Sequence, residues 1–243
     1  MDVVKGELGE LRAGTSRVLR GAHTAGGWKL LLLSVLLAGC VNAPRNTSGV
    51  DGSHANDPQM NDTQMLARVT AGVVAIGNQS TSLASGFFVD GGFIVTNQHV
   101  LQQAPLYVIV GDKRDVVEPI ASNEELDLAI LSSKLSSSNA MTIASDSVLV
   151  GERVYAVGNP FGLGITVSHG IVSALPGTVG PNSGLLTDAP INAGNSGGPL
   201  INRRGEVVGV VTRRGRVGSG IGFATPAAEL AQLLEQVRQK QGD

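Results

Sequence analysis

Short apolar runs rich in β-branched residues recur along the chain from about Val69, and turn-forming residues separate them. The clearest runs are GVVAIG, GFFVD, GFIVTNQHV, LYVIVGD, LAIL, VYAVG, GIVSAL and EVVGVVT. Strands at this spacing, with no long helical pattern between them before residue 225, are typical of an antiparallel sandwich or barrel. The sequence therefore predicts an all-β domain.

One helix is predicted, at the C-terminus, over residues 226–243. The residues that would form its apolar face recur at helical spacing: Leu230, Leu233, Leu234 and Val237. Thr225 is expected to cap the first turn, and Pro226 suits the first helical position. We expect this helix to pack on the surface of the barrel.

The N-terminal segment, residues 1–39, has the organisation of a secretory signal. Basic residues precede the apolar run LLLLSVLLAG, which is too short to cross about 30 Å of hydrocarbon as a helix. The ending LAGC resembles a bacterial lipobox, which implies that Cys40 is lipidated and becomes the first residue of the mature lipoprotein. A buried helix with a chance cysteine is the alternative interpretation. Lipidation at Cys40 would attach the protein to a bacterial envelope membrane, facing the periplasm or the exterior.

Residues 40–65 are predicted to form a flexible tether, because they hold few large apolar side chains and many Asn, Asp, Ser, Gly and Pro. The folded domain is expected over residues 66–225. A formal net charge of −2 gives no basic face for nucleic acid. The single cysteine excludes an internal disulfide, and no cluster of metal-ligand residues is evident. We therefore expect neither a metal nor an organic cofactor.

Ser196 lies in the glycine-rich stretch APINAGNSGGPLIN, which suits neither a helix nor an ordinary strand. A serine hydroxyl becomes a good nucleophile only when a neighbouring base removes its proton and a third group orients that base. GNSGG also fits the nucleophile elbow of α/β-hydrolases, but that fold needs a histidine after the serine. All four histidines precede Ser196: His23, His54, His99 and His169.

His99 is the best candidate for the base, because it ends an apolar run that leads into a polar turn. His23 lies before the expected cleavage site and His54 in the expected tether. His169 lies in the middle of a predicted strand, where a surface or structural role is expected. A lone histidine at a strand end is often only a polar cap, so the argument depends on finding its partners.

Asp127 is the best candidate for the orienting carboxylate, because it begins the apolar run LAIL and would be partly buried. Asp112 and Asp115 lie in a charged turn and are expected to be solvated, and Asp188 has an apolar strand on one side only. The order His99, Asp127, Ser196 is the order used on chymotrypsin-type double barrels. An ordinary glycine turn at Ser196 is the alternative interpretation.

Five segments together resemble the HtrA/Deg family of trypsin-like serine proteases, from about residue 70 to 226. They are SGFFVDGGFIVTNQHVL, DLAIL, GNPFGLGITVSHGIVSAL, TDAPINAGNSGGPLIN and GIGFATP. The resemblance implies a chymotrypsin-like double antiparallel β-barrel with a C-terminal α-helix. It also implies that His99 is the general base, Asp127 its orienting carboxylate and Ser196 the nucleophile. Family members commonly carry C-terminal PDZ domains, and we expect none here.

The resemblance also implies an oxyanion hole and a specificity pocket. The backbone N–H groups of Gly194 and Ser196 would bind the oxyanion, with Asn195 between them shaping the turn. The residues implied to line the pocket are Pro190, Gly220, Ile221, Gly222 and Phe223. None of them is charged, so small or medium aliphatic side chains are expected before the cleaved bond. Arg213, Arg214 and Arg216 lie nearby in the sequence and would instead favour an acidic side chain.

The function predicted is a serine endopeptidase of the bacterial cell envelope that acts on polypeptides, with protein quality control as its expected role. It would work through an acyl-enzyme intermediate. A non-catalytic peptide-binding or chaperone module on the same fold is the alternative from another class. An esterase on this scaffold would differ only in the leaving group.

Overall fold

The computed structural model describes residues 61–78, 81–103, 105–159, 163–180, 184–212 and 220–242. All of these belong to one unit of the chain, His54–Asp243. The predicted signal segment 1–39, Cys40 and the tether up to residue 60 lie outside the described residues, as do Arg213, Arg214 and Arg216.

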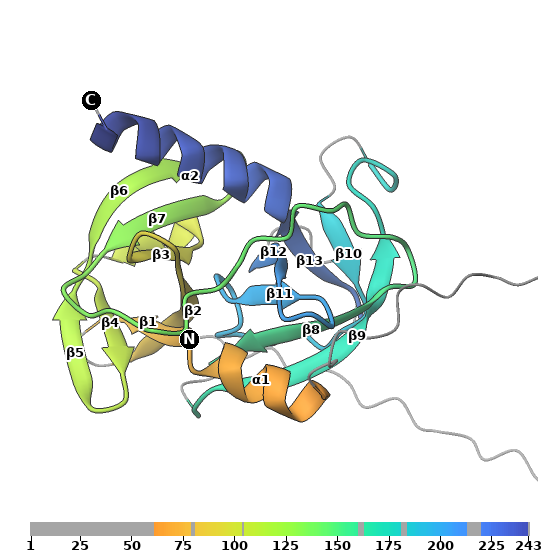
Figure 1. Cartoon of the computed structure of the whole chain (residues 1–243), viewed down its shortest axis with the longest axis horizontal. Helices are drawn as coiled ribbons and strands as arrows, with labels where there is room; N and C mark the ends of the chain where they lie inside the picture. The colour runs from red at the N-terminus through yellow and green to blue at the C-terminus, as the bar shows by residue number, and fades with distance from the viewer. Residues whose placement is uncertain are drawn as a thin grey trace, which may run out of the picture. The chain divides into compact units, whose positions relative to one another are not determined.

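The first half of the domain is a seven-stranded antiparallel sheet in the order β5-β4-β1-β2-β3-β7-β6 (Figure 1). Its strands are β1 (Val73–Gly77), β2 (Ser82–Val89), β3 (Phe93–Thr96), β4 (Tyr107–Val110), β5 (Lys113–Val116), β6 (Glu118–Asn123) and β7 (Leu128–Ser132). A 3₁₀ helix, η1 (Gln98–Gln103), follows β3. Among the described residues, no hydrogen bonds pair β5 with β6, so these two strands are the edges of the sheet.

The second half is a closed antiparallel barrel in the order β10-β13-β12-β11-β8-β9. Its strands are β8 (Arg153–Gly158), β9 (Thr166–Ala174), β10 (Leu185–Thr187), β11 (Pro199–Ile201), β12 (Val207–Thr212) and β13 (Gly222–Pro226). The predicted arrangement of two barrel-like sheets is confirmed, with the difference that only the second closes.

Three apolar clusters explain why the sequences of many strands are continuous apolar runs. Phe88 and Ile94 lie in the core of the first sheet, and Leu200 lies in the core of the second barrel. A third cluster contains residues of both sheets, including Phe87 and Ile201. Strands that contribute to it are buried on both faces, so they lack the simple apolar–polar alternation of a half-exposed sheet.

The C-terminal helix α2 (Ala227–Gly242) confirms the predicted helix and its apolar face. Its buried residues are Ala227, Leu230, Leu233, Leu234 and Val237. The last four lie in the cluster shared by the two sheets, and α2 runs along β6, β12 and β13 (Figure 1). The predicted cap at Thr225 is wrong: Thr225 belongs to β13, and its hydroxyl donates a hydrogen bond to the Leu126 carbonyl at 2.8 Å.

A second helix, α1 (Asp62–Thr70), was not predicted, and it begins inside the segment 40–65 expected to be a tether. The Asn61 side chain caps it by accepting a hydrogen bond from the Gln64 backbone N–H at 2.8 Å. Only two of its residues, Met65 and Val69, are buried, and they join the cluster shared by the two sheets. Such a narrow apolar stripe gives a weak signal in a polar sequence.

Within the described ranges, no helix combines the length and the apolar character needed to cross a membrane.

Candidate active site

His99 and Asp127 are brought together from two neighbouring parts of the first sheet. His99 lies in η1, just after β3, and Asp127 lies directly before β7, which pairs with β3. The ring Nδ1 of His99 lies 2.9 Å from Oδ2 and 3.0 Å from Oδ1 of Asp127. The backbone N–H of His99 also donates to Asp127 Oδ1 at 3.0 Å. Two bonds from one residue hold the imidazole in a fixed orientation against the carboxylate.

Asp127 is completely buried, whereas the side chain of His99 is 31% exposed. Burial acts to raise the pKa of the Asp127 carboxyl. Hydrogen bonds from the His99 ring, the Thr212 hydroxyl and the His99 backbone outweigh burial, so that this pKa lies below its ordinary value. An ionised carboxylate only accepts hydrogen bonds, so Nδ1 of His99 carries the proton and Nε2 is left as a proton acceptor.

Thr212, at the end of β12, is a residue of this site that the sequence analysis missed. Its hydroxyl donates to Asp127 Oδ2 at 2.6 Å and so connects the second barrel to the buried carboxylate. The two residues are 85 positions apart. A threonine at the end of an apolar strand was the only available signal, and it is too common to be diagnostic.

Ser196 lies in the turn between β10 and β11, and its residue exposure is 2%. The turn needs glycine on both sides, because Gly194 has φ of +99° and Gly197 of +82°. A Cβ at Gly197 would also collide with the Ser85 carbonyl oxygen and the Thr96 hydroxyl. The Oγ of Ser196 is buried and forms no hydrogen bond with any described residue, His99 included.

The turn of Ser196 is nevertheless anchored next to the His99–Asp127 pair. The N–H of Gly197 donates to the Val211 carbonyl at 2.8 Å, and Val211 immediately precedes the Thr212 that bonds Asp127. A Cβ at Gly197 would lie 3.1 Å from the backbone nitrogen of Asn97, two residues before His99. Hydrogen bonds between catalytic groups are often long in unliganded enzymes, so the absent His99–Ser196 bond does not exclude the trio.

The N–H groups of Gly194 and Ser196 have no acceptor among the described residues. The neighbouring Asn195 N–H, by contrast, donates to the Asn192 carbonyl at 3.1 Å, and the Asn195 carbonyl accepts from Gly198 at 2.9 Å. Asn195 therefore shapes the turn through its backbone. Its side-chain oxygen is buried and has no partner within the described part of the chain.

The residues expected in the specificity pocket lie on β13 and before Ser196. Gly222 pairs with Thr187 of β10, and Phe223 pairs with Thr212 of β12. Ile191 is a neighbour of Gly222 that the sequence reasoning did not single out: a Cβ at Gly222 would collide with its Cγ1. Its side chain therefore lies directly over Gly222. Gly220, Ile221 and Pro190 are exposed, and the Pro190 carbonyl accepts a 2.7 Å bond from Ser168.

The candidates set aside in the sequence lie away from this pair. His169 is exposed in β9, where its ring centroid lies 6.2 Å from that of Tyr155. Asp188 is exposed and accepts from the Ile171 N–H at 2.7 Å. Asp115 differs from the expectation of a solvated carboxylate, because it is half-buried and accepts a 2.7 Å bond from the Ser133 hydroxyl.

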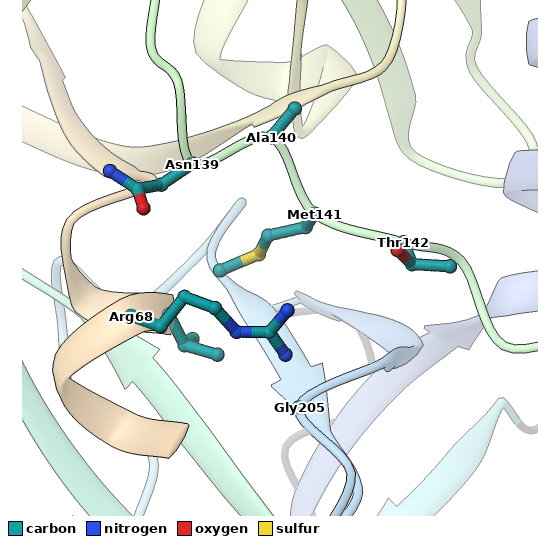
Figure 2. A pocket seen from close by; sticks show the side chains of 7 residues that line it. Arg68, Asn139, Ala140, Met141, Thr142 and Gly205 are labelled. Atoms are coloured by element: carbon teal, nitrogen blue, oxygen red, sulfur yellow. The ribbon is translucent and has the colours of Figure 1, made fainter. Parts of the chain in front are cut away.

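A small pocket elsewhere in the domain contains none of these residues (Figure 2). It lies between α1, the segment 139–142 and the turn between β11 and β12, where Arg68 extends towards Gly205. Arg68 donates to the Arg204 carbonyl at 3.2 Å, which makes this a packing contact between the helix and the barrel. In the described ranges, no group of three or more His, Cys, Asp or Glu side chains is arranged to hold a metal ion.

Comparison with known proteins identifies the same kind of domain. A family model described as a trypsin-like peptidase domain matches residues 84–210, just over half of the chain. A probable periplasmic serine protease, do/HhoA-like, from Haemophilus influenzae is 37% identical over 169 residues, which cover 64% of this chain and 36% of that protein. The periplasmic pH-dependent serine endoprotease DegQ of Escherichia coli is 41% identical over 172 residues, which cover 64% of this chain and 37% of that protein. The chain spans little more than a third of the length of these two relatives.

Solved structures agree with the sequence comparisons. The serine endoprotease from Yersinia pestis matches with a TM-score of 0.63 and 35% identity, covering 73% of this chain and 66% of that one. The HtrA-type protease AlgW, solved with a decapeptide, matches with a TM-score of 0.63 and 26% identity, and the match covers 74% of this chain and 68% of that one. These likenesses confirm the predicted chymotrypsin-like fold.

Proposed function

This chain belongs to the trypsin-like peptidases of the HtrA/Deg type, and from that premise we propose that it is a serine endopeptidase of the bacterial cell envelope. Its substrates would be polypeptides, and its role would lie in protein quality control. The observation that carries the proposal is the buried, ionised Asp127 bound to His99 beside the turn of Ser196. In the proposed arrangement His99 Nε2 serves as the base for the Ser196 hydroxyl, and the proposal is supported by the absence of any hydrogen bond from that hydroxyl to another described residue.

The proposed reaction uses each group in turn. Ser196 Oγ attacks the peptide carbonyl carbon while His99 Nε2 takes the hydroxyl proton. The N–H groups of Gly194 and Ser196 donate to the oxygen that becomes negatively charged. The C–N bond then breaks as His99 protonates the leaving amine, which gives an ester on Ser196. Water, deprotonated by His99, attacks that ester and releases the carboxylic acid and the free serine.

Fluorophosphonate labelling tests the proposal directly, because the reagent reacts with an activated serine. The chain over residues 40–243 should be labelled and should hydrolyse casein, and the Ser196→Ala variant should do neither. A wild-type chain that binds peptides but is neither labelled nor hydrolytic would contradict the proposal and favour a non-catalytic peptide-binding or chaperone module. A chain that hydrolyses small esters but does not hydrolyse peptides would favour an esterase.

We also propose that Cys40 is lipidated after removal of residues 1–39, with the residues before α1 serving as a tether. The periplasmic relatives support an envelope location, and the LAGC ending supports lipid attachment. Cys40→Ser should abolish incorporation of a labelled fatty acid in bacterial cells, whereas His54→Ala in the same segment should leave it unchanged. Equal incorporation by the Cys40→Ser variant would remove Cys40 from the proposal.

The pocket beside Ser196 should favour small or medium aliphatic side chains such as Val or Ala before the cleaved bond. Ile191 over Gly222 limits the space, and none of the proposed lining residues carries a charge. Ile191→Ala should therefore raise kcat/KM for Leu or Phe relative to Ala at this position by about 10-fold. A peptide library measures the profile, and Ile171→Ala, an exposed change on β9, is the matched control. A dominant preference for Arg or Lys would count against the proposed pocket.

A further inference from the structure

Ser85 is a buried polar residue on the face of the first sheet that meets the second barrel. Along β2, Ala84 and Phe88 point into the core of the first sheet, whereas Phe87 and Val89 join the cluster shared by both sheets. Strand alternation places Ser85 on the same face as Phe87. Ser85 is completely buried, and β2 contacts β8 of the second barrel (Figure 1).

Every polar atom of Ser85 forms a hydrogen bond. Its hydroxyl donates to the Gly194 carbonyl at 2.6 Å and accepts from the Asn159 N–H at 2.8 Å. Its backbone N–H donates to the Ser196 carbonyl at 2.8 Å. Its own carbonyl accepts from the Thr96 hydroxyl at 2.8 Å. Two of these four bonds therefore hold the turn that carries the two free N–H groups, one on either side of Asn195.

The surroundings of Ser85 leave little room for it to move. A Cβ at Gly158 would lie 2.8 Å from the Ser85 hydroxyl and 2.9 Å from the side-chain oxygen of Asn195. A Cβ at Gly198 would lie 3.2 Å from Cβ of Ser85. The two glycines thus allow the end of β8 and the turn of Ser196 to pack directly against this one side chain.

The turn has backbone hydrogen bonds of its own through Asn195, and Ser85 adds a restraint at Gly194 from the first sheet. Gly194 has φ of +99° and, as a glycine, has access to many other conformations. The Asn195 side chain does not restrain the turn, because its oxygen has no partner among the described residues. The hydroxyl of Ser85 binds the carbonyl of Gly194 and so holds one end of the peptide plane between Gly194 and Asn195, whose N–H end donates to the Asn192 carbonyl at 3.1 Å. This plane lies between the two peptide planes that carry the N–H groups of Gly194 and Ser196.

We propose that Ser85 is a positioning residue that holds the oxyanion-binding N–H groups of Gly194 and Ser196 in their working orientation. This proposal rests on the proposed serine endopeptidase function. Ser85 does not contact the reacting atoms in this scheme; it acts through the backbone of the turn. The same hydroxyl also binds Asn159, whose side chain accepts a 2.7 Å bond from the Gly164 N–H, so the restraint extends to the loop after β8.

Ser85→Ala tests this role when kcat and KM are measured per active site, counted by fluorophosphonate titration. We expect kcat to fall about 10-fold to 100-fold with KM nearly unchanged, because misplaced donors affect the transition state more than substrate binding. The inhibition constant of a peptidyl boronic acid, whose tetrahedral adduct uses the same N–H groups, should rise by a similar factor.

Ser133→Ala is the matched control. The Ser133 hydroxyl also donates one bond, to Asp115 at 2.7 Å, and accepts one, from the Leu135 N–H at 3.0 Å, but Ser133 lies directly after β7, away from Ser196. Its loss should lower thermal stability without changing kcat. If Ser85→Ala does not fold, Ser85→Cys, which keeps a weak donor, replaces it with the same expected direction.

If the wild-type chain is an active peptidase and the Ser85→Ala variant keeps both the wild-type kcat and the wild-type affinity for the boronic acid, the role proposed for Ser85 is overturned and the proposed function is not. A wild-type chain that neither hydrolyses peptides nor reacts with a fluorophosphonate would overturn the proposed function and, with it, this inference.

Discussion

Alanine in place of Ser196 is expected to lower kcat for peptide hydrolysis by about 10⁴-fold to 10⁶-fold, because the nucleophile is removed while the rest of the site stays in place. The Oγ of Ser196 has no hydrogen-bond partner among the described residues, so its loss strands no donor or acceptor. We therefore expect the melting temperature to stay at or slightly above that of the wild type.

Steady-state kinetics and thermal denaturation of the same preparation check this result. His99→Ala should cost nearly as much as Ser196→Ala, and the double variant should cost little more, because the residues of a triad act as a unit. Ser122→Ala, at an exposed position of β6, is the matched control and should leave kcat unchanged. Near-wild-type hydrolysis by the Ser196→Ala protein would contradict the proposed mechanism as a whole.

The candidate catalytic residues and the C-terminal helix could be proposed from the sequence because each depends on a local pattern or on the order of residues along the chain. Chain order excludes the hydrolase elbow, since all four histidines precede Ser196. The position of Asp127 before an apolar run predicts partial burial, and in the structure Asp127 is completely buried. The helical spacing that begins at Leu230 predicts the face of α2 that packs into the domain.

The features that the sequence did not reveal depend on contacts between distant residues. Thr212 and Ser85 reach the site through hydrogen bonds that span 85 and 109 positions, and no local pattern encodes such a pairing. Thr225 is a further example. Threonine is a residue type that often caps helices, but the hydroxyl of Thr225 instead donates a hydrogen bond to the carbonyl of Leu126, 99 positions away. Helix α1 was missed because tertiary packing of Met65 stabilises it more than its own sequence does.

Asparagine in place of Asp127 is expected to lower kcat by roughly 10⁴-fold while the fold is retained. The carboxylate accepts hydrogen bonds from the His99 ring, the His99 backbone and the Thr212 hydroxyl. An amide offers only one oxygen to these donors, and its NH₂ group favours the His99 tautomer in which Nδ1 is the acceptor and Nε2 carries the proton. In that tautomer His99 cannot take the proton of Ser196. The backbone should not resist the change, because Asp127 has φ of +54°, a conformation that asparagine adopts readily.

Asp115→Asn is the matched control for the loss of a carboxylate. Asp115 is also hydrogen-bonded, by the Ser133 hydroxyl and the Lys134 N–H, and these bonds hold its pKa below the ordinary value. A carboxyl with a lowered pKa stabilises the fold at pH values above its unfolded pKa, and this contribution is lost as the pH falls through the folded pKa. Asp115→Asn should therefore reduce stability at neutral pH without changing kcat, whereas Asp127→Asn should reduce kcat severely. The His99 tautomer can be followed by nitrogen NMR of the ring, and an Asp127→Asn enzyme within 10-fold of wild-type kcat would exclude an orienting role for this carboxylate.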